Sequence, residues 1–488
     1  MTTRPRPIFR RNGIRAFEAQ FADVEPRLME RAGCALAALA GSMLDGALKP
    51  ILIAAGPGNN GGDGLVAARL LKEQGHAVTV VFAGDSGRLP ADARTALEKW
   101  RAAGGEIVSE IPDLRFALVV DALFGIGLTR PIEGKAAELI ARINTLDCPV
   151  LAVDIPSGLD ADTGRSTGPV VRATQTITFI ALKPGLLMRE GPDHCGKVEL
   201  CDLGIATAAG EGEAISRLHF RDCLVARDRD SHKGSFGSVG VIGGAPGMAG
   251  ATLLAGRAAL KLGAGRVYVG MLDRLAVDPL QPELMLRQAD EVLQLATVLA
   301  VGPGLGRSAR ALELLRQAIE TQLPVLIDAD GLNLLAEHPV LARRLARREA
   351  ATLMTPHPAE AGRLLGIATD TVQADRLAAA LTIARIHRAH VVLKGCGSIV
   401  ATPGGRWFIN TTGNPGLATG GSGDVLTGMI AALIAQGWPP LEAMVGGTHL
   451  HGSAADALVQ TGIGPIGLTA GEIAHAARTT LNRWIADA

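Results

Sequence analysis

The feature that most constrains the fold is a repeated alternation of uninterrupted apolar runs with helical patterns. The first series of runs lies at residues 50–55, 77–82, 116–122, 149–154 and 176–181. A second series lies at residues 238–244, 266–271, 298–304, 324–330, 351–356 and 390–395. Runs that are apolar throughout are typical of strands buried on both faces, and hence of parallel sheets with helices on each side. The sequence therefore predicts the α/β class, in two three-layer α/β domains.

The length and the segment between the two series predict where the domains divide. A chain of 488 residues is too long for one core, at roughly 100–200 residues per domain. Between the series, residues 203–215 are mostly small or acidic, which is typical of a linker. The two series carry different glycine-rich loops, so they are not a tandem repeat. We expect one domain at residues 1–215 and another at 220–488.

Charge and cysteine content indicate which partners to expect. Lys+Arg and Asp+Glu both total 48, so bulk charge favours neither nucleic acid nor an anionic membrane. The six cysteines form no C-x-x-C pair, which is typical of reduced thiols, and no uncharged apolar run reaches 18 residues. We expect a soluble cytoplasmic protein that binds neither nucleic acid nor membrane. We also expect a homo-oligomer, although the sequence specifies no number of chains.

A glycine-rich loop, GPGNNGGDG at residues 56–64, follows the first apolar run and precedes a helical pattern. Its G-x-G-x-x-G spacing lets backbone N–H groups approach a phosphate at a helix N-terminus. An ordinary nicotinamide dehydrogenase is disfavoured, because the second run ends at Phe82 and the nearest acid is Asp85, three residues later. The alternative is a tight turn with Asp63 as helix N-cap, which leaves Asn59 and Asn60 unexplained.

Polar residues stand at the ends of two later apolar runs. Asp121 and Asp154 each close a run, and Ser157 follows the second. Ligands of open α/β sheets bind at the carboxyl ends of the strands, so these residues and Asn60 are expected to converge there. A buried carboxylate is costly unless a cation or ligand uses it. Asp160 and Asp162 lie in the motif GLDADTG (158–164), where we favour a role in a turn over a role in ligand binding.

Five motifs in order resemble the NAD(P)HX epimerase domain, across about residues 10–205. They are LMERAG (28–33), GPGNNGGDG (56–64), DALFGIGLTRP (121–131), VDIPSGLDADTG (153–164) and ALKPGL (181–186). The resemblance implies a Rossmann-like domain that interconverts the R and S forms of hydrated NADH and NADPH (NADHX and NADPHX). It also implies that Asp154 is the acid/base and that Asn60, Asp121 and Ser157 bind K+. The implied substrate-binding residues are Asn59, Asn60, Gly61, Gly62, Asp63, Gly125, Ile126, Gly127, Leu128, Thr129, Arg130, Pro131 and Asp154.

A second glycine-rich loop, at residues 414–424, leads into the helical pattern VLTGMIAALIAQG. Small residues just before a helix expose backbone N–H groups in an anion hole. An acid beside them, Asp424, can take a proton from a hydroxyl that attacks a terminal phosphoryl group. The alternative is that Asp424 is an ordinary helix N-cap.

Six further motifs resemble the ADP-dependent NAD(P)H-hydrate dehydratase, within the ribokinase-like superfamily, across about residues 225–480. They are SHKGSFGSVGVIGGAPGMAGA (231–251), GPGLGR (302–307), DADGLNLL (328–335), TPHPAE (355–360), VVLKGCGSIV (391–400) and GGSGDVLTG (420–428). The resemblance implies conversion of S-NAD(P)HX to NAD(P)H with ADP as co-substrate and Mg2+, and Asp424 as the catalytic residue. The implied substrate-binding residues are Ala251, Gly304, Gly306, His357 and Asp424. The implied nucleotide-binding residues are Lys394, Gly395, Cys396, Gly397, Ser398 and Gly423.

Together these features predict a bifunctional enzyme of nicotinamide-nucleotide repair, whose partners are NADHX, NADPHX and ADP. One alternative is a ribokinase-like small-molecule kinase with an accessory nucleotide- or RNA-binding domain. Another is a binding protein, because the epimerase-like domain has relatives used as RNA-associated scaffolds. His449 and His451 have i, i+2 spacing, which favours ordinary helix histidines over a metal pair.

Overall fold

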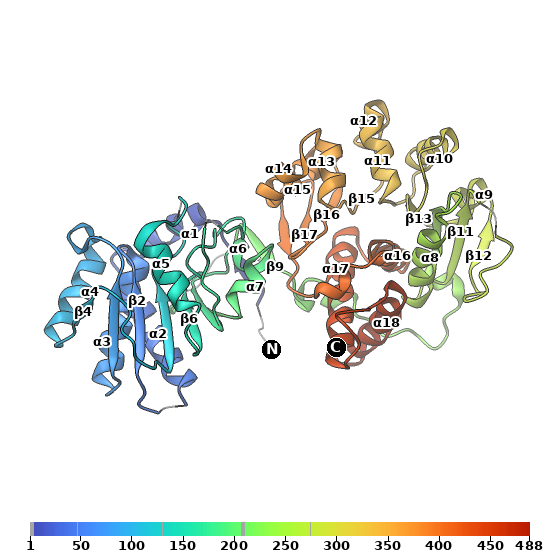
Figure 1. Ribbon diagram of the computed structural model, residues 1–488. Coiled ribbons are helices and arrows are strands. Elements are labelled where there is room, and N and C mark those ends of the chain that lie inside the picture. The colour runs from blue at the N-terminus through green and yellow to red at the C-terminus, as the bar shows by residue number, and fades with distance from the viewer. Residues whose placement is uncertain (1–3, 46, 129, 167, 206–209, 274) are drawn as a thin grey trace. The chain divides into compact units, whose positions relative to one another are not determined.

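The computed structural model describes residues 4–45, 47–128, 130–166, 168–205, 210–273 and 275–488 (Figure 1). The chain divides into two compact units. The N-terminal unit is Arg6–Gly212, and the C-terminal unit is Glu213–Ala488 together with Arg4 and Pro5. No helix in the described ranges is both long enough and apolar enough to cross a membrane.

The N-terminal unit is built on one parallel sheet with the strand order β4-β3-β2-β5-β6-β7-β8. The strands of this sheet are β2 (Ile51–Ala55), β3 (Val78–Phe82), β4 (Ile107–Val108), β5 (Leu118–Ala122), β6 (Val150–Val153), β7 (Gln175–Phe179) and β8 (Lys197–Cys201), and the unit also contains β1 (Arg6–Ile8), which is not part of this sheet. Its α-helices are α1 (Arg11–Glu18), α2 (Leu28–Met43), α3 (Asn59–Glu73), α4 (Ala91–Ala102), α5 (Gly134–Ile143), α6 (Pro184–Leu187) and α7 (Gly191–Cys195). Each apolar run of the first series contains or overlaps one of these strands.

Burial on both faces explains why these strands are apolar at every position. In β2, Ile51 and Ile53 belong to a core with Leu36 of α2 on one face of the sheet. Leu52 belongs to a second core with Ile140 of α5 on the other face. The three-layer α/β fold predicted for this part of the chain is therefore confirmed.

The C-terminal unit contains a second, mixed sheet with the strand order β9-β18-β17-β16-β15-β14-β13-β10-β11-β12. Its strands are β9 (Gly212–Ala214), β10 (Ser238–Gly243), β11 (Arg266–Met271), β12 (Met285–Arg287), β13 (Val298–Val301), β14 (Val325–Ile327), β15 (Thr352–Met354), β16 (His390–Leu393), β17 (Ile399–Ala401) and β18 (Trp407–Ile409). Its α-helices are α8 (Ala249–Lys261), α9 (Ala289–Leu295), α10 (Ala309–Glu320), α11 (Asp330–Glu337), α12 (Pro339–Leu345), α13 (Pro358–Leu365), α14 (Thr369–Ala374), α15 (Arg376–His387), α16 (Ser422–Ala435), α17 (Pro440–Gln460) and α18 (Ala470–Ala486). Strands β10 to β16 run parallel, whereas β17 is antiparallel to both β16 and β18.

The end of the predicted linker is part of this second sheet. Strand β9 pairs in parallel with β18, with Glu213 opposite Phe408 and Ala214 opposite Ile409. Ala214 and Ile215 are buried. This segment is short and partly polar, so it lacks the long apolar run that is typical of the other strands. Residues 212–214 are thus a strand rather than part of a linker.

Helices α8 and α16 are in backbone contact at Gly428. A Cβ atom placed on Gly428 would lie 2.0 Å from the carbonyl oxygen of Ala255 in α8. Both residues are buried in the core of the C-terminal unit. Only glycine permits this approach, so the sequence sets the distance between the two helices.

Candidate active sites

Polar residues of the N-terminal unit lie at the carboxyl ends of adjacent parallel strands. Asp121 is the penultimate residue of β5, Asp154 directly follows β6, and Lys183 follows β7. Helix α3 begins at Asn59, four residues after β2 ends. Because β2, β5, β6 and β7 are neighbours in the sheet, these residues share one edge of it.

Asp121 and Ser157 form a buried, directly bonded pair. The Ser157 hydroxyl donates to Asp121 Oδ1 at 2.6 Å, and the Ser157 amide donates to Oδ2 at 2.8 Å. Burial raises the pKa of Asp121 to about 6, although the hydrogen bonds from Ser157 and from the backbone of Leu123 partly offset this effect. No positively charged side chain among the described residues pairs with this carboxylate.

Asn60 is brought to the same region through the loop after β5. The Phe124 amide donates to Ser157 Oγ at 2.8 Å, and a Cβ atom on the next residue, Gly125, would lie 2.9 Å from Asn60 Oδ1. Asn60 Nδ2 is buried and has no hydrogen-bond partner within the described chain. The oxygen and nitrogen of an amide are assigned rather than observed, so a half-turn places a carbonyl oxygen at this buried position.

Asp154 is held by a lysine that the sequence motifs contain but did not assign. Asp154 has a positive φ of 66°, a conformation that non-glycine residues rarely adopt. Its Oδ1 accepts hydrogen bonds from Lys183 Nζ and, at 3.3 Å, from Thr178 Oγ1. Lys183 is 1% exposed and also donates to Thr178 Oγ1 at 2.8 Å and to the Phe179 carbonyl at 3.0 Å. The buried ammonium therefore fixes the Asp154 carboxylate at the strand end.

Two further carboxyl groups act on this pair. Burial raises the pKa of Asp63 well above its ordinary value, and the negative charges of Asp154 and Glu18 raise it further. Burial, followed by the charge of Asp154, also raises the pKa of Glu18. Asp63 lies in the second turn of α3, whose N-cap is Gly58. The N-cap alternative for Asp63 is therefore wrong, and Asp63 is a buried carboxyl group whose pKa is raised in part by the charge of Asp154.

The remaining predicted residues of this site lie in the two loops that border it. A Cβ atom on Gly61 would lie 2.0 Å from the Gly56 carbonyl oxygen, and one on Gly56 would lie 1.7 Å from that of Leu123, so the loops after β2 and β5 touch through their backbones. The second loop contains Gly125, Ile126, Gly127, Leu128, Arg130 and Pro131. Thr129 lies outside the described residues. Asp160 accepts hydrogen bonds from the amides of Asp162 and Thr163, which confirms its predicted turn role.

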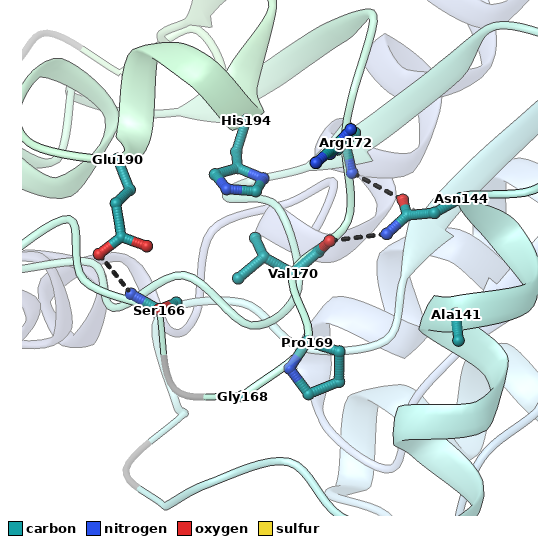
Figure 2. A pocket seen from close by; sticks show the side chains of 9 residues that line it. All are labelled: Ala141, Asn144, Ser166, Gly168, Pro169, Val170, Arg172, Glu190 and His194. Carbon is teal, nitrogen blue, oxygen red and sulfur yellow. Dashed lines mark hydrogen bonds between the residues drawn. The ribbon is translucent and has the colours of Figure 1, made fainter.

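A pocket at the opposite edge of this sheet is distinct from the carboxylate cluster. Its volume is about 510 Å3, and Figure 2 shows its lining residues, with Asn144 before β6, Arg172 before β7 and His194 before β8. Asn144 braces the wall, because its side chain donates to the Val170 carbonyl at 2.8 Å and accepts from the Arg172 amide at 2.9 Å. These positions precede the strands, so the pocket is separate from Asp121 and Asp154.

The C-terminal unit has its own charged cluster at the carboxyl edge of its sheet. Lys394 follows β16 and donates to Asp328 Oδ1, after β14, at 2.8 Å. Thr427 of α16 donates to Asp328 Oδ2 at 2.7 Å, and Glu360 Oε2 lies 3.9 Å from Lys394 Nζ. Burial lowers the pKa of Lys394, but the carboxylates of Asp328 and Glu360 outweigh burial and raise it above its ordinary value.

Asp424 is in the first turn of α16 beside this cluster. Burial raises its pKa to about 7, the charge of Asp328 adds to this effect, and Lys394 partly opposes it. The helix N-cap is Gly421, and Asp424 accepts no hydrogen bond from any residue the structure describes. The N-cap alternative for Asp424 is therefore wrong. Its carboxyl group is available to a ligand.

The other predicted residues of this unit form two groups. In the first group, a Cβ atom on Gly304 would lie 3.3 Å from Cβ of Ala251, and the Gly306 amide donates to Asp330 at 2.9 Å. In the second group, a Cβ atom on Gly423 would lie 3.2 Å from Lys394 Nζ. The segment from Lys394 to Ser398 turns through positive φ angles at its two glycines, Gly395 and Gly397, and includes the exposed Cys396.

His357 has a structural role that the sequence left open. Its Nδ1 accepts from the Ala359 amide at 3.1 Å, and the Glu360 side chain accepts from the His357 amide at 2.7 Å, which together form a capping box for α13. Because Nδ1 is an acceptor, the proton of the neutral ring is on Nε2. Nε2 lies 3.3 Å from Glu360 Oε1, and the side chain is 47% exposed, so a ligand can also contact the ring. His449 and His451 lie on α17, where His451 bonds the Ser422 carbonyl at 3.0 Å, as expected of helix histidines.

The fold and the two clusters define an α/β enzyme with two active sites, one Rossmann-like and one ribokinase-like. Residues 25–185 match the family described as YjeF-related protein N-terminus, and residues 239–476 match the family described as NAD(P)H-hydrate dehydratase. A ribokinase-like superfamily protein from Enterococcus faecalis is similar in structure, with a TM-score of 0.50 and 27% identity over 57% of this chain and 99% of that chain.

Two curated relatives match most of the chain. Both are named bifunctional NAD(P)H-hydrate repair enzyme. The relative from Moorella thermoacetica is 40% identical across 83% of this chain and 82% of its own length. The relative from Escherichia coli K12 is 38% identical across 99% of this chain and 95% of its own length. The chain belongs to the family of bifunctional NAD(P)H-hydrate repair enzymes, which confirms the predicted family and fold class.

Proposed function

We propose that the N-terminal unit interconverts R- and S-NAD(P)HX and that Asp154 is its acid/base. The observation that carries this proposal is the buried Lys183–Asp154 pair at the end of β6, beside the loop of α3. Moving the hydroxyl of the hydrate from one face of the ring to the other requires a group that donates a proton and retrieves it. Asp154 is positioned by Lys183 and Thr178 rather than by solvent, so its orientation is fixed before substrate arrives.

Asp63 supports Asp154 in this proposal. Burial raises the pKa of Asp63 well above its ordinary value, and the charges of Asp154 and Glu18 raise it further, which favours its protonated form. A second carboxyl group with a raised pKa would give Asp154 a partner for proton exchange. The loops at 59–63 and 125–131 would hold the dinucleotide by their backbones.

A potassium ion fits Asn60, Asp121 and Ser157, which are the residues proposed to bind it. Their oxygens are the hard ligands that such a cation prefers. The Asp121 carboxylate is fully buried without a cationic partner, an arrangement that a bound cation would stabilise. When bound, K+ would order the loop after β5, which carries Gly125.

We propose that the C-terminal unit dehydrates S-NAD(P)HX at the expense of ADP, with Asp424 as the base. The supporting observation is an unbonded carboxyl group of raised pKa at the start of α16, beside the Lys394–Asp328 pair. Asp424 would take the proton of the substrate hydroxyl as its oxygen attacks the terminal phosphorus of ADP. AMP leaves, and the phosphorylated oxygen becomes a good leaving group. The ring nitrogen's lone pair then expels phosphate and forms NAD(P)H.

The anion hole and Lys394 would neutralise the charge of the transferred group. The N–H groups at the start of α16, including that of Gly423, would bind the phosphate, and Lys394, whose Nζ lies beside Gly423, would add a positive charge. Mg2+ would enter with the nucleotide, since proteins hold it through one or two carboxylates together with phosphate oxygens. Within the described residues, no group of three His, Cys, Asp or Glu side chains forms a metal site by itself. The segment from Lys394 to Ser398 would hold the nucleotide.

The proposed partners are therefore NADHX, NADPHX and ADP. A homo-oligomer remains a proposal from the sequence. A cytoplasmic location is supported by the six cysteines, since none of them forms a disulfide bond in the part of the chain that the structure describes.

One incubation tests both activities. Purified full-length protein is mixed with the R and S epimers of NADHX, with and without ADP and Mg2+. We expect the epimers to equilibrate without nucleotide and NADH to form only with it. Accumulation of a phosphorylated hydrate without NADH would favour the kinase alternative, and tight RNA binding without turnover would favour the scaffold alternative.

A further inference from the structure

The C-terminal unit has a pocket that lies outside the cluster of Asp424, Lys394 and Asp328. Its volume is about 240 Å3, and it lies at the carboxyl ends of β11 and β12, which form one edge of the sheet beside α8 and α9 (Figure 1). It is lined by Met271, Leu275, Leu286, Arg287, Gln288 and Glu291.

This pocket lies next to the loop that leads to Ala251. A Cβ atom on Gly244, after β10, would lie 3.0 Å from Met271 Cε, and the Asp273 amide donates to the Gly244 carbonyl at 2.8 Å. In the sheet, β12 is two strands from β10, a distance of about 10 Å. The pocket is therefore on the same edge as the catalytic cluster, on the side away from Lys394 and β16.

The pocket wall on the β11 side is braced from α8. Arg257 donates to both oxygens of Asp278, at 2.7 and 2.6 Å, and Asp278 is fully buried. The hydrogen bonds from Arg257 hold the pKa of Asp278 below its ordinary value, so the pair stays charged. Asp278 also accepts from the Leu280 amide at 3.1 Å, which fixes the segment that follows Leu275.

The lining has the chemistry of an adenosine phosphate. Met271, Leu275 and Leu286 offer apolar surface to a base. Glu291 offers a carboxylate to ribose hydroxyls, and Arg287 offers a guanidinium to phosphate, the two groups that commonly read the ribose end of NAD and NADP. Arg287 is exposed, and its side chain donates a hydrogen bond to the neighbouring Leu286 carbonyl at 2.9 Å.

We propose that this pocket binds the adenosine half of the hydrated dinucleotide while the hydrated ring lies at Asp424. This inference rests on the dehydratase function proposed above. Arg287 binds phosphate there, including the 2′-phosphate of NADPHX. Glu291 accepts hydrogen bonds from the 2′-hydroxyl of NADHX and repels the 2′-phosphate.

The test compares Arg287→Ala and Glu291→Gln in the full-length protein with Arg343→Ala, an exposed arginine on α12, as control. We expect Arg287→Ala to raise the KM for S-NADPHX about tenfold, with the KM for ADP unchanged. Glu291→Gln should shift the preference toward S-NADPHX roughly threefold. The control should match wild type in each measurement.

Two additional measurements separate the outcomes. With the hydrate of reduced nicotinamide mononucleotide, which lacks the adenosine half, Arg287→Ala and wild type should have equal KM values. Binding of NADPH needs no turnover, and its affinity should fall in Arg287→Ala even if no dehydration is detected. Unchanged KM and NADPH affinity in both variants would overturn the pocket assignment, and a changed KM for ADP would assign the pocket to the co-substrate instead. Absence of dehydration in wild type with normal NADPH binding would refute the proposed reaction and not the pocket.

Discussion

Dehydration should depend on pH through Asp424. As the proposed base, this carboxyl group must be ionised, and its pKa is raised to about 7, first by burial and then by neighbouring carboxylates. The rate should therefore rise with pH and level off above about pH 8. One pH unit below its pKa only about one carboxyl group in eleven is ionised, so kcat/KM should be about a tenth of its plateau there.

The Glu360→Gln variant should shift the dependence of kcat/KM on pH. Glutamine can still accept the hydrogen bond from the His357 amide, now 2.7 Å from the Glu360 carboxylate, but it removes one of the negative charges that raise the pKa of Asp424. Removing a nearby like charge lowers a carboxyl pKa. The midpoint should therefore move to a lower pH than in wild type, while the plateau rate changes little.

Asp424→Asn removes the base and keeps the shape of the side chain. Turnover should fall by roughly 10²–10⁴-fold, the range for loss of a general acid or base, and the dependence on this midpoint should disappear. NADH formation by absorbance gives the rates, and calorimetry gives the affinity for ADP. Near-normal turnover of the variant, or one midpoint shared by wild type and Glu360→Gln, would refute the base assignment. Lost ADP binding would show that Asp424 shapes the nucleotide site instead.

Three further perturbations test the N-terminal unit and the division of the chain. Lys183→Met should lower epimerisation on the order of 100-fold and leave dehydration unchanged, because Asp154 loses the group that orients it; unchanged epimerisation would contradict that role. Asp121→Ala should weaken epimerisation in the presence of K+ and abolish its dependence on K+. Equal activity of variant and wild type in buffer that contains K+, or an equal response of both to added K+, would count against the cation site. Separate N-terminal and C-terminal fragments should each retain one activity. A C-terminal fragment that begins at residue 211 should have a free energy of unfolding roughly 2–3 kcal/mol larger than one that begins at residue 220, because it keeps β9 and the buried Ile215. Urea unfolding of the two fragments measures the difference, and equal midpoints would show that β9 contributes nothing.

Most buried strands were predictable from the sequence, whereas the edge strand β8 and the three-residue strands β9, β17 and β18 were not. Strands such as β2 contact helices on both faces, so every position is apolar and the run is visible. Strand β8, at the sheet edge, is exposed or half-buried at each position, and β9 has only three residues. Their stability comes from pairing with a neighbour, which a local pattern does not reveal.

The same difference explains which site residues were identified. Asp121 and Asp154 end apolar runs, and Asp424 follows a glycine loop, so their local context marks them. Lys183 is significant only because Asp154, 29 residues earlier, lies against it. Asp328 likewise pairs with Lys394, 66 residues away. Such pairs arise from the arrangement of strands, which one sequence does not specify.

The backbone contact at Gly428 restricts how the dehydratase site can move. Helix α16 carries Asp424, the proposed base, and helix α8 carries Ala251, a proposed substrate-binding residue. These two helices touch at Gly428 without an intervening side chain. Sliding or tilting of one helix against the other would bring backbone atoms into collision. Closure around the two substrates must therefore come from the loops, such as the segment from Lys394 to Ser398, while the helices form a rigid base. Opening and closing rates are then set by loop motion rather than by domain rearrangement within this unit.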